Sequence, residues 1–256
     1  MRSEAEVREV FRLHALGLSH YQIAERTGCP RTNVGRWLGL GIERALNLPR
    51  RVAQCTIGQV CPLVHAVPSE AYAYLLGQYL GDGHIVRCRK DVYRLEVGCC
   101  RQYPSIMDEC DAAMSAVLPH NRVSRRQRPG IFAVGIYSKH LPCLFPQHGH
   151  GMKHTRPIVL EPWQSRIALD LAPELFLRGL IHSDGCRGVN TVRNRTGKQY
   201  SYPRYQFTNR SDDIRELFCE ACDHVGAEWR RMNRWTISVA RRESVARLDQ
   251  FIGPKC

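Results

Sequence analysis

The N-terminal residues alternate apolar and polar positions with the period of short amphipathic helices. Apolar residues recur three and four positions apart between residues 4 and 16, and Gly17-Leu18-Ser19 interrupts that pattern with a helix-ending glycine and a capping serine. The pattern resumes over residues 20–27, and Gly28-Cys29-Pro30 predicts a tight turn before a third helix over residues 31–38. We therefore predict a small all-helical domain at residues 1–44, then a glycine- and proline-containing linker at residues 45–68.

The remainder, residues 69–256, contains one structural unit twice. Residues 69–83 and 173–185 are apolar helical runs that both end in Asp-Gly, with the two aspartates, Asp82 and Asp184, 102 residues apart. Strand-like alternation, a helical period and further strand-like sequence follow in each half. These paired segments are 93–97 and 205–208, 104–117 and 212–225, and 131–137 and 235–240. The sequence thus predicts a duplicated α+β unit, with repeat one at residues 69–160 and repeat two at 172–253.

Small residues mark one face of each Asp-Gly helix. Gly77 and Gly81 stand four positions apart in the first helix, as do Gly179 and Ser183 in the second, so two backbones can approach closely. If these helices pack on each other, the two aspartates come side by side at helix ends that already carry partial negative charge. Because carboxylates repel at short range, a hard cation such as Mg²⁺ would relieve the conflict and serve phosphodiester hydrolysis.

At these residues the chain resembles a known family. The segments LLGQYLGDG at 75–83 and LRGLIHSDG at 177–185 resemble the paired motifs of single-chain LAGLIDADG (DOD-type) homing endonucleases, and the resemblance spans about residues 69–253. It implies a pseudo-symmetric αββαββα core whose saddle-shaped antiparallel sheets lie on the major groove of double-stranded DNA. The sixth motif position, often acidic in that family, departs from the pattern as Leu80 in one copy and His182 in the other.

The same resemblance assigns site residues. It implies that Asp82 and Asp184 are catalytic and bind Mg²⁺ or Mn²⁺, with Gly81 and Ser183 contributing to the metal site. Such nucleases place a basic or amide side chain near the metals. One candidate is Lys139, which follows a predicted strand and has Arg242 as its repeat counterpart. The other is Lys153, in a segment at 149–158 that resembles the stretch between the two repeats of related proteins.

Residues that contact the DNA are expected on the sheet faces and their flanking loops. Alternation directs Leu95 and Val97 to the core and leaves Arg94 and Glu96 outward. Arg and Gln suit guanine and adenine edges, although an ordinary solvated sheet face would have a similar composition. The candidates are Arg87, Arg89, Arg94, Glu96, Arg125, Arg126 and Arg128 in repeat one, and Arg187, Asn190, Arg193, Arg204, Gln206, Arg234 and Arg242 in repeat two.

The helical domain at residues 1–44 also resembles DNA-binding proteins. Residues 17–38 resemble the helix-turn-helix of resolvase-like and transcription-factor domains, in which the last helix enters the major groove. By that match, Arg31, Thr32, Asn33 and Arg36 would contact DNA. The alternative is a small helical bundle that contacts another protein.

Composition agrees with a polyanionic partner. The formal net charge is +13 over 256 residues, a basic excess that favours nucleic acid. Apolar residues make up 43% of the chain, but none of the runs approaches the roughly 18 residues of a membrane span. We therefore expect a cytoplasmic, nucleoid-associated protein that binds double-stranded DNA and neither a membrane nor a small-molecule substrate. Two motifs in one chain predict a monomer with internal pseudo-two-fold symmetry.

Cysteine and histidine spacing offers weaker alternatives. Twelve cysteines in a cytosolic chain favour thiols over disulfides. Structural zinc at Cys55 and Cys61, or at Cys219 and Cys222, lacks a second pair at matching spacing, so we expect buried thiols there. The histidines between residues 140 and 154 lie in a proline- and glycine-containing connector without acidic residues, so we do not expect a dedicated metal site there.

The leading hypothesis is a site-specific, metal-dependent endonuclease for double-stranded DNA. Its rival is a non-cleaving transcriptional regulator on the same scaffold, because LAGLIDADG-type scaffolds joined to helix-turn-helix modules resemble known bacterial regulators. Retention of Asp82 and Asp184 favours the enzyme. A maturase that binds structured RNA is a third interpretation.

Overall fold

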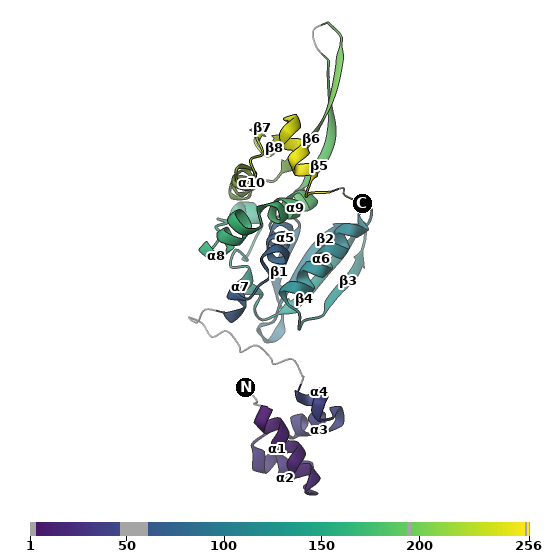
Figure 1. Cartoon of the computed structure of the whole chain (residues 1–256), viewed down its shortest axis with the longest axis vertical. Coiled ribbons are helices and arrows are strands. Elements are labelled where there is room, and N and C mark those ends of the chain that lie inside the picture. Colours follow the sequence, from purple (N-terminus) through teal and green to yellow (C-terminus); the bar gives the residue numbers. More distant parts are fainter. Residues whose placement is uncertain (1–3, 47–60, 194–195, 254, 256) are drawn as a thin grey trace. The chain divides into compact units, whose positions relative to one another are not determined.

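Four short helices at the N-terminus enclose a small apolar core. The computed structural model describes residues 4–46, 61–193, 196–253 and 255, and the chain divides into two units, Met1–Gln54 and Cys55–Cys256. The helices of the first unit are α1 (Glu4–Ala15), α2 (His20–Thr27), α3 (Arg31–Leu40) and α4 (Ile42–Leu46) (Figure 1). Their core consists of Val7, Val10, Leu13, Ile23, Cys29, Val34, Trp37 and Ala45.

The start and end of α2 have the predicted causes. Ser19 caps the helix, because its side chain accepts from the Gln22 amide while the Gln22 side chain accepts from the Ser19 amide. Gly28 ends it with a φ of 64°, a left-handed conformation that glycine adopts at little cost. The helical part extends beyond the expected start of the linker, since Ala45 is buried within α4.

The second unit contains the predicted duplication. Repeat one comprises α5 (Ser69–Leu80), β1 (Gly83–Arg87), β2 (Tyr93–Cys100), α6 (Pro104–Val117), β3 (Val123–Arg128), β4 (Ile131–Ser138) and α7 (Leu141–Leu144). Repeat two comprises α9 (Pro173–Asp184), β5 (Gly185–Arg193), β6 (Gln199–Thr208), α10 (Asp212–His224), β7 (Arg230–Arg231), β8 (Thr236–Val239) and α11 (Arg242–Asp249). The fold is therefore α+β with a duplicated αββαββα core, as the sequence predicted.

Short helical segments join these parts. The 3₁₀ turns are η1 (Pro62–His65), η2 (Arg89–Asp91) and η3 (Lys153–Thr155), and the connection between the repeats contains α8 (Pro162–Ser165) and the π-helical η4 (Arg166–Leu171). Among the described residues, none of the helices is long and apolar enough to cross a membrane.

Each repeat forms one antiparallel four-stranded sheet, and the two sheets have the same order. The strands run β1-β2-β4-β3 in repeat one and β5-β6-β8-β7 in repeat two. Leu95 and Val97 of β2, and Tyr205 and Phe207 of β6, point into the core and are buried, as strand alternation predicted. Helices α5 and α9 lie between the two sheets and supply the largest share of the core (Figure 1).

Candidate active site

Helices α5 and α9 pack through their glycines. A Cβ atom at Gly179 would lie only 2.3 Å from the Tyr74 carbonyl oxygen, and one at Gly77 only 2.6 Å from the Phe176 carbonyl oxygen. A Cβ at Gly81 would lie 2.1 Å from Ser183 Oγ. Such distances leave no space for a side chain, so the glycines are what allows the two backbones to touch. The predicted helix-helix contact is confirmed.

The glycines that follow the two aspartates make a second pair of close contacts. A Cβ at Gly83 would lie 2.5 Å from Tyr79 Cα, and one at Gly185 would lie 2.7 Å from Ile181 Cα. Each glycine thus lets the chain leave its helix and enter a strand directly, β1 in one half and β5 in the other. The Asp-Gly sequence therefore fixes where each aspartate stands, at the junction of helix and strand.

Asp82 and Asp184 consequently face one cavity. That cavity has a volume of about 570 Å³, and it is lined by both aspartates and by residues of β1, the β6 end and the connection after α7. Asp82 is exposed in it and Asp184 is half-buried. Restricted solvent and the charge of Asp82 raise the pKa of Asp184 to about 6, while Asn209, which donates to Asp184 Oδ2 at 2.6 Å, acts in the opposite sense. Restricted solvent also raises the pKa of Asp82, which Lys153 and Lys255 oppose.

Lys153 lies against the same pair. Its Nζ donates to the carbonyl oxygens of Tyr79, Gly81 and Gly83 at 2.5, 2.6 and 2.8 Å, so all three ammonium donors are used at the end of α5. Restricted solvent lowers the pKa of Lys153 to about 8, and the charges of Asp184 and Asp82 limit that decrease. Of the two lysines predicted from the sequence, this is the one that lines the cavity.

The sequence interpretation missed the matching lysine of repeat two. Lys255 Nζ donates to the Gly185 carbonyl oxygen, as Lys153 does to that of Gly83. Lys255 lines a second cavity, of about 90 Å³, together with Asp82. The signal was available, because Lys153 and Lys255 are each the lysine of a Gly-x-Lys sequence at the same distance from the aspartate of their repeat. The two glycines of that sequence, Gly151 and Gly253, both have positive φ, 78° and 68°.

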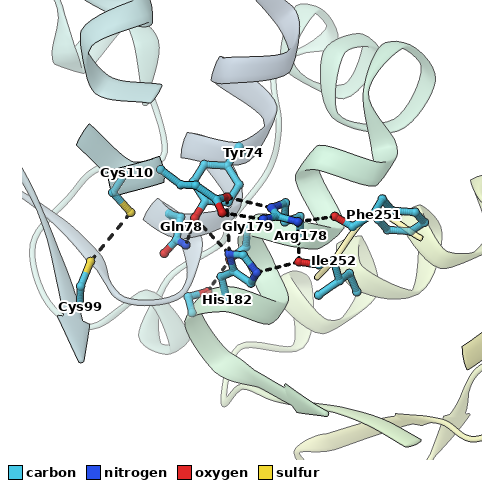
Figure 2. A network of polar contacts seen from close by, with 11 residues as sticks. Tyr74, Gln78, Cys99, Cys110, Arg178, Gly179, His182, Phe251 and Ile252 are labelled. Atoms are coloured by element: carbon cyan, nitrogen blue, oxygen red, sulfur yellow. Dashed lines mark hydrogen bonds and ion pairs between the residues drawn. The ribbon is translucent and has the colours of Figure 1, made fainter. Parts of the chain in front are cut away.

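A polar network holds the chain just before Lys255 (Figure 2). Arg178 of α9 donates to the carbonyl oxygens of Phe251 and Ile252, both at 2.6 Å, and forms a two-bond ion pair with Glu109 of α6. His182 Nε2 lies 2.9 Å from the same Ile252 oxygen. We call Arg178, His182 and Glu109 the C-terminal clamp.

The imidazole of the clamp has one consistent hydrogen-bond pattern. Gln78 donates to the Tyr74 hydroxyl at 2.9 Å, and that hydroxyl lies 3.2 Å from His182 Nδ1 (Figure 2). Burial, together with Arg178, lowers the pKa of His182 to about 4, so the ring is neutral at pH 7. A neutral ring that accepts from Tyr74 through Nδ1 and donates through Nε2 satisfies the whole chain of groups. His182, which stands where the family often has an acidic residue, therefore has a structural role: it links α9 to Ile252 and to Tyr74.

The other basic candidates lie away from the aspartates. Lys139 is exposed after β4, where its charge acts on Asp91, and Arg242 is the exposed first residue of α11. Neither lines the cavity that contains Asp82 and Asp184. The structure thus does not bring Lys139 to the site, because β4 ends at the far side of its sheet from the α5 terminus.

Strand register divides the predicted DNA-contacting residues between two faces. Residues opposite each other share a face, so Arg94, Glu96, Arg126 and Arg128 lie on the face of the first sheet away from α6. In the second sheet Asn190, Arg204 and Gln206 share the corresponding face with Tyr200 and Tyr202. Arg89 lies in η2, and Arg234 lies in the β7–β8 turn beside Trp235.

Several predicted contacts need correction. Glu96 is only 2% exposed, because Arg94 and Arg128 cover it and pair with it, so its predicted outward exposure was wrong. Arg125 points to the helix side, where it binds Asp108 at 2.7 Å and Asp111 at 2.9 Å.

Three other arginines that were predicted to contact DNA face the helix side of their sheet or form ion pairs with carboxylates. Arg187 binds Asp249 of α11 through two hydrogen bonds of 2.7 and 2.8 Å, and Arg87 is paired with Asp91. Arg193 lies opposite Gln199 on the same side as Arg187. The register that sets these faces depends on pairing between distant segments, which the sequence pattern did not reveal.

The remaining candidates are placed as follows. Arg31, Thr32 and Arg36 are exposed on α3 and Asn33 is half-exposed there. Cys219 and Cys222 are buried in α10, and burial raises the pKa of both thiols, that of Cys219 to about 12. Cys55 lies outside the described residues, and Cys61 is buried with its Sγ 3.5 Å from His140 Nδ1.

Comparisons with known proteins agree with these two folds. The family described as sigma-70, region 4 matches residues 4–44. No curated protein sequence matches the chain. Among solved structures, mesophilic variants of the homing endonuclease I-DmoI share 15% identity over 73% of this chain and 97% of theirs, with a TM-score of 0.50. I-DmoI in complex with DNA and Mn gives 15% identity, 73% and 99% coverage and a TM-score of 0.50.

The second unit has the LAGLIDADG homing endonuclease fold. At 15% identity the likeness shows the fold alone. Activity depends on the side chains that this chain places on that fold.

Proposed function

We propose that the protein is a site-specific endonuclease that hydrolyses phosphodiester bonds of double-stranded DNA with divalent metal held by Asp82 and Asp184. The observation that carries the proposal is the shared placement of both carboxylates at touching helix ends, facing one cavity. The structure of I-DmoI in complex with DNA and Mn, to which this chain is similar, supports the same function.

The two carboxylates fit a divalent cation. Within the described residues, neither Asp82 nor Asp184 forms an ion pair with a basic side chain. Restricted solvent raises the pKa of both carboxyls, so holding both as anions costs free energy that a cation would offset. Mg²⁺ is commonly held by one or two carboxylates, with water and substrate phosphate completing its shell. Gly81 lines the larger cavity, and its carbonyl oxygen, which accepts from Lys153, has a second lone pair. Ser183 borders the smaller cavity.

Other groups of the chain would act on the phosphate. Bound metal would supply an activated water and neutralise charge on the phosphate oxygens. Lys153 and Lys255 hold ammonium groups near Asp82, in the larger and the smaller cavity respectively, and can stabilise the charge that develops as one P–O bond forms and another breaks. Arg156 and Arg210 line the larger cavity and can bind flanking phosphates.

The test is cleavage of DNA enriched by binding. Duplexes selected from a random library would be incubated with the full chain in Mg²⁺, in EDTA, and with an Asp82→Asn/Asp184→Asn variant. We expect double-strand breaks with Mg²⁺ only, and none with the variant. Asp170→Asn is the matched control, since that carboxylate is exposed and lies outside the cavity. Cleavage by the double variant at the wild-type rate would refute the proposal.

A second function is supported by the N-terminal unit. Its match to sigma-70, region 4 favours a DNA-binding regulator that uses α3 for recognition. Salt-sensitive binding of selected duplexes without breaks in Mg²⁺ or Mn²⁺ would favour the regulator. In both functions, Arg31→Ala/Arg36→Ala is expected to weaken DNA binding and to lower its salt dependence.

A further inference from the structure

The second sheet carries a two-stranded ribbon that the first sheet lacks. Strands β5 and β6 pair over nine positions, from Gly185–Phe207 to Arg193–Gln199, but β8 supports β6 only at Tyr205–Thr208. Residues 188–193 and 199–204 therefore form a ribbon that no third strand of the described residues joins. In the first sheet, β4 pairs with all of β2 from Tyr93 to Cys100. Figure 1 shows β5 and β6 extending well beyond β8.

We propose that this ribbon lies in a groove of the DNA and makes the half-site of repeat two longer than that of repeat one. The inference rests on the proposed function, which supplies the DNA, but it adds an asymmetry that the duplicated fold does not predict. A two-stranded β-ribbon fits the width of the major groove. The ribbon would therefore contact base pairs outside the central part of the DNA site.

The length of the ribbon sets the expected extension. Six residues in each strand lie beyond the last position that β8 supports, Gly188–Arg193 and Gln199–Arg204. At about 3.3 Å per residue the ribbon reaches about 20 Å. Base pairs follow one another every 3.4 Å or so, so the ribbon spans about six of them.

The ribbon exposes apolar and aromatic side chains that a bound partner would cover. Val192, Tyr200 and Tyr202 lie on the face that continues from Arg204 and Gln206, and their exposed fractions are 46%, 48% and 37%. An isolated two-stranded ribbon is marginally stable in water, and exposed apolar side chains add to that cost. Apolar side chains in the major groove contact thymine methyl groups, and tyrosine hydroxyls can reach phosphates.

Charge identifies the partner as a polyanion. The sequence between Gly185 and Ser211 contains Arg187, Arg193, Arg195, Lys198, Arg204 and Arg210 and no acidic residue. The corresponding β1–β2 hairpin of repeat one contains Asp91 and Glu96 among its basic residues. The phosphates of a DNA backbone attract a segment that is basic throughout, whereas binding to a second protein chain does not in general require such a charge.

Pro203 is consistent with a ribbon that stays open. It lies on β6 opposite Val189, two residues before the stretch that β8 supports. Proline cannot donate to a neighbouring strand and is confined to edge strands, so it discourages continuation of β8 along the ribbon.

The test compares the two flanks of the selected site. All proteins would carry Arg31→Ala/Arg36→Ala, so that the N-terminal unit does not add a footprint of its own. Binding sites would be selected from random duplexes and mapped by hydroxyl-radical footprinting. The ribbon variant is Val192→Ser/Tyr200→Ser/Tyr202→Ser, and the matched control is Val159→Ser/Leu171→Ser, which changes two apolar residues of the same unit with exposed fractions of 73% and 54%.

We expect protection to extend about six base pairs farther on one flank, with sequence preference there. The ribbon variant should lose the extra protection and preference and bind at least tenfold more weakly, while the other flank and the control stay unchanged. Equal flanks for the parent protein, or a ribbon variant that matches the control, would overturn the ribbon proposal alone. Failure to select any duplex would overturn the proposed function as well. Loss of self-association in the ribbon variant, with an unaltered footprint, would assign the ribbon to a second copy and also overturn it.

Discussion

A methyl group added at Gly179 tests whether contact between α5 and α9 builds the site. In Gly179→Ala the new Cβ would lie 2.3 Å from the Tyr74 carbonyl oxygen, about 1 Å short of the 3.4 Å at which ordinary contact begins. Because the obstacle is backbone, no rotamer change removes the overlap, and the two helices have to move apart. Overpacking of this kind costs about 3 kcal/mol. The higher helix propensity of alanine returns about 1 kcal/mol, which leaves a net loss of about 2 kcal/mol.

This loss corresponds to a roughly 30-fold lower ratio of folded to unfolded protein. Urea unfolding followed by circular dichroism would measure it, and cleavage of the selected duplex would be measured on the folded fraction. We expect cleavage to fall about 100-fold, since a misplacement of about 1 Å in a reacting geometry has that effect. The control is Gly39→Ala in α3, where a Cβ would meet no atom within 4 Å, so cleavage should change little and stability should not fall. A Gly179→Ala protein with wild-type stability and cleavage would refute the packing argument.

Three further predictions concern the groups around the aspartates. Because the pKa of Asp184 is raised to about 6, cleavage should fall about tenfold per pH unit below pH 6, and higher Mg²⁺ should shift that limb to lower pH; a rate independent of pH from 5 to 7 would contradict this. Lys153→Gln and Lys255→Gln should each lower the cleavage rate 10²-fold or so with little change in DNA affinity, whereas Lys139→Gln should change neither. Arg178→Met should release the chain before Lys255, so adding it to Lys255→Gln should cost little more cleavage than Lys255→Gln alone; additive losses would show that the C-terminal clamp does not act through Lys255.

The free energy of unfolding should depend on pH through Asp184. The folded-state pKa of Asp184 lies above its unfolded value of 3.8, so the group favours folding below that value and loses this contribution as pH rises through about 6. A bound divalent cation should offset the loss at neutral pH.

The sequence predicted those parts of the site that local spacing determines. Glycines four residues apart and a terminal Asp-Gly, present twice, were enough to predict that α5 and α9 touch and that Asp82 and Asp184 share a cavity. The helix-turn-helix was equally accessible, because Ser19 and Gly28 cap α2 through contacts within a few residues.

Long-range register and connections were not accessible in the same way. Whether Arg125 faces α6 or the opposite side depends on its pairing with Val134. Glu96 is buried under Arg94 and Arg128, and Arg128 lies on β3, which does not pair with the strand of Glu96. The role of Lys255 was missed because the repeat was compared only through its helices and strands. The Gly-x-Lys sequence, present in both repeats, is the signal that relates Lys255 to Lys153.

The most direct test of the central claim is to locate the metal. Crystals of the full chain with a selected duplex would be grown in Mn²⁺, and anomalous diffraction would be measured at a wavelength where manganese scatters strongly. The account predicts an anomalous peak between the carboxylates of Asp82 and Asp184, beside a DNA phosphate, which disappears in Asp82→Asn/Asp184→Asn. Well-ordered DNA with manganese bound elsewhere, or with no peak between those two carboxylates, would contradict it.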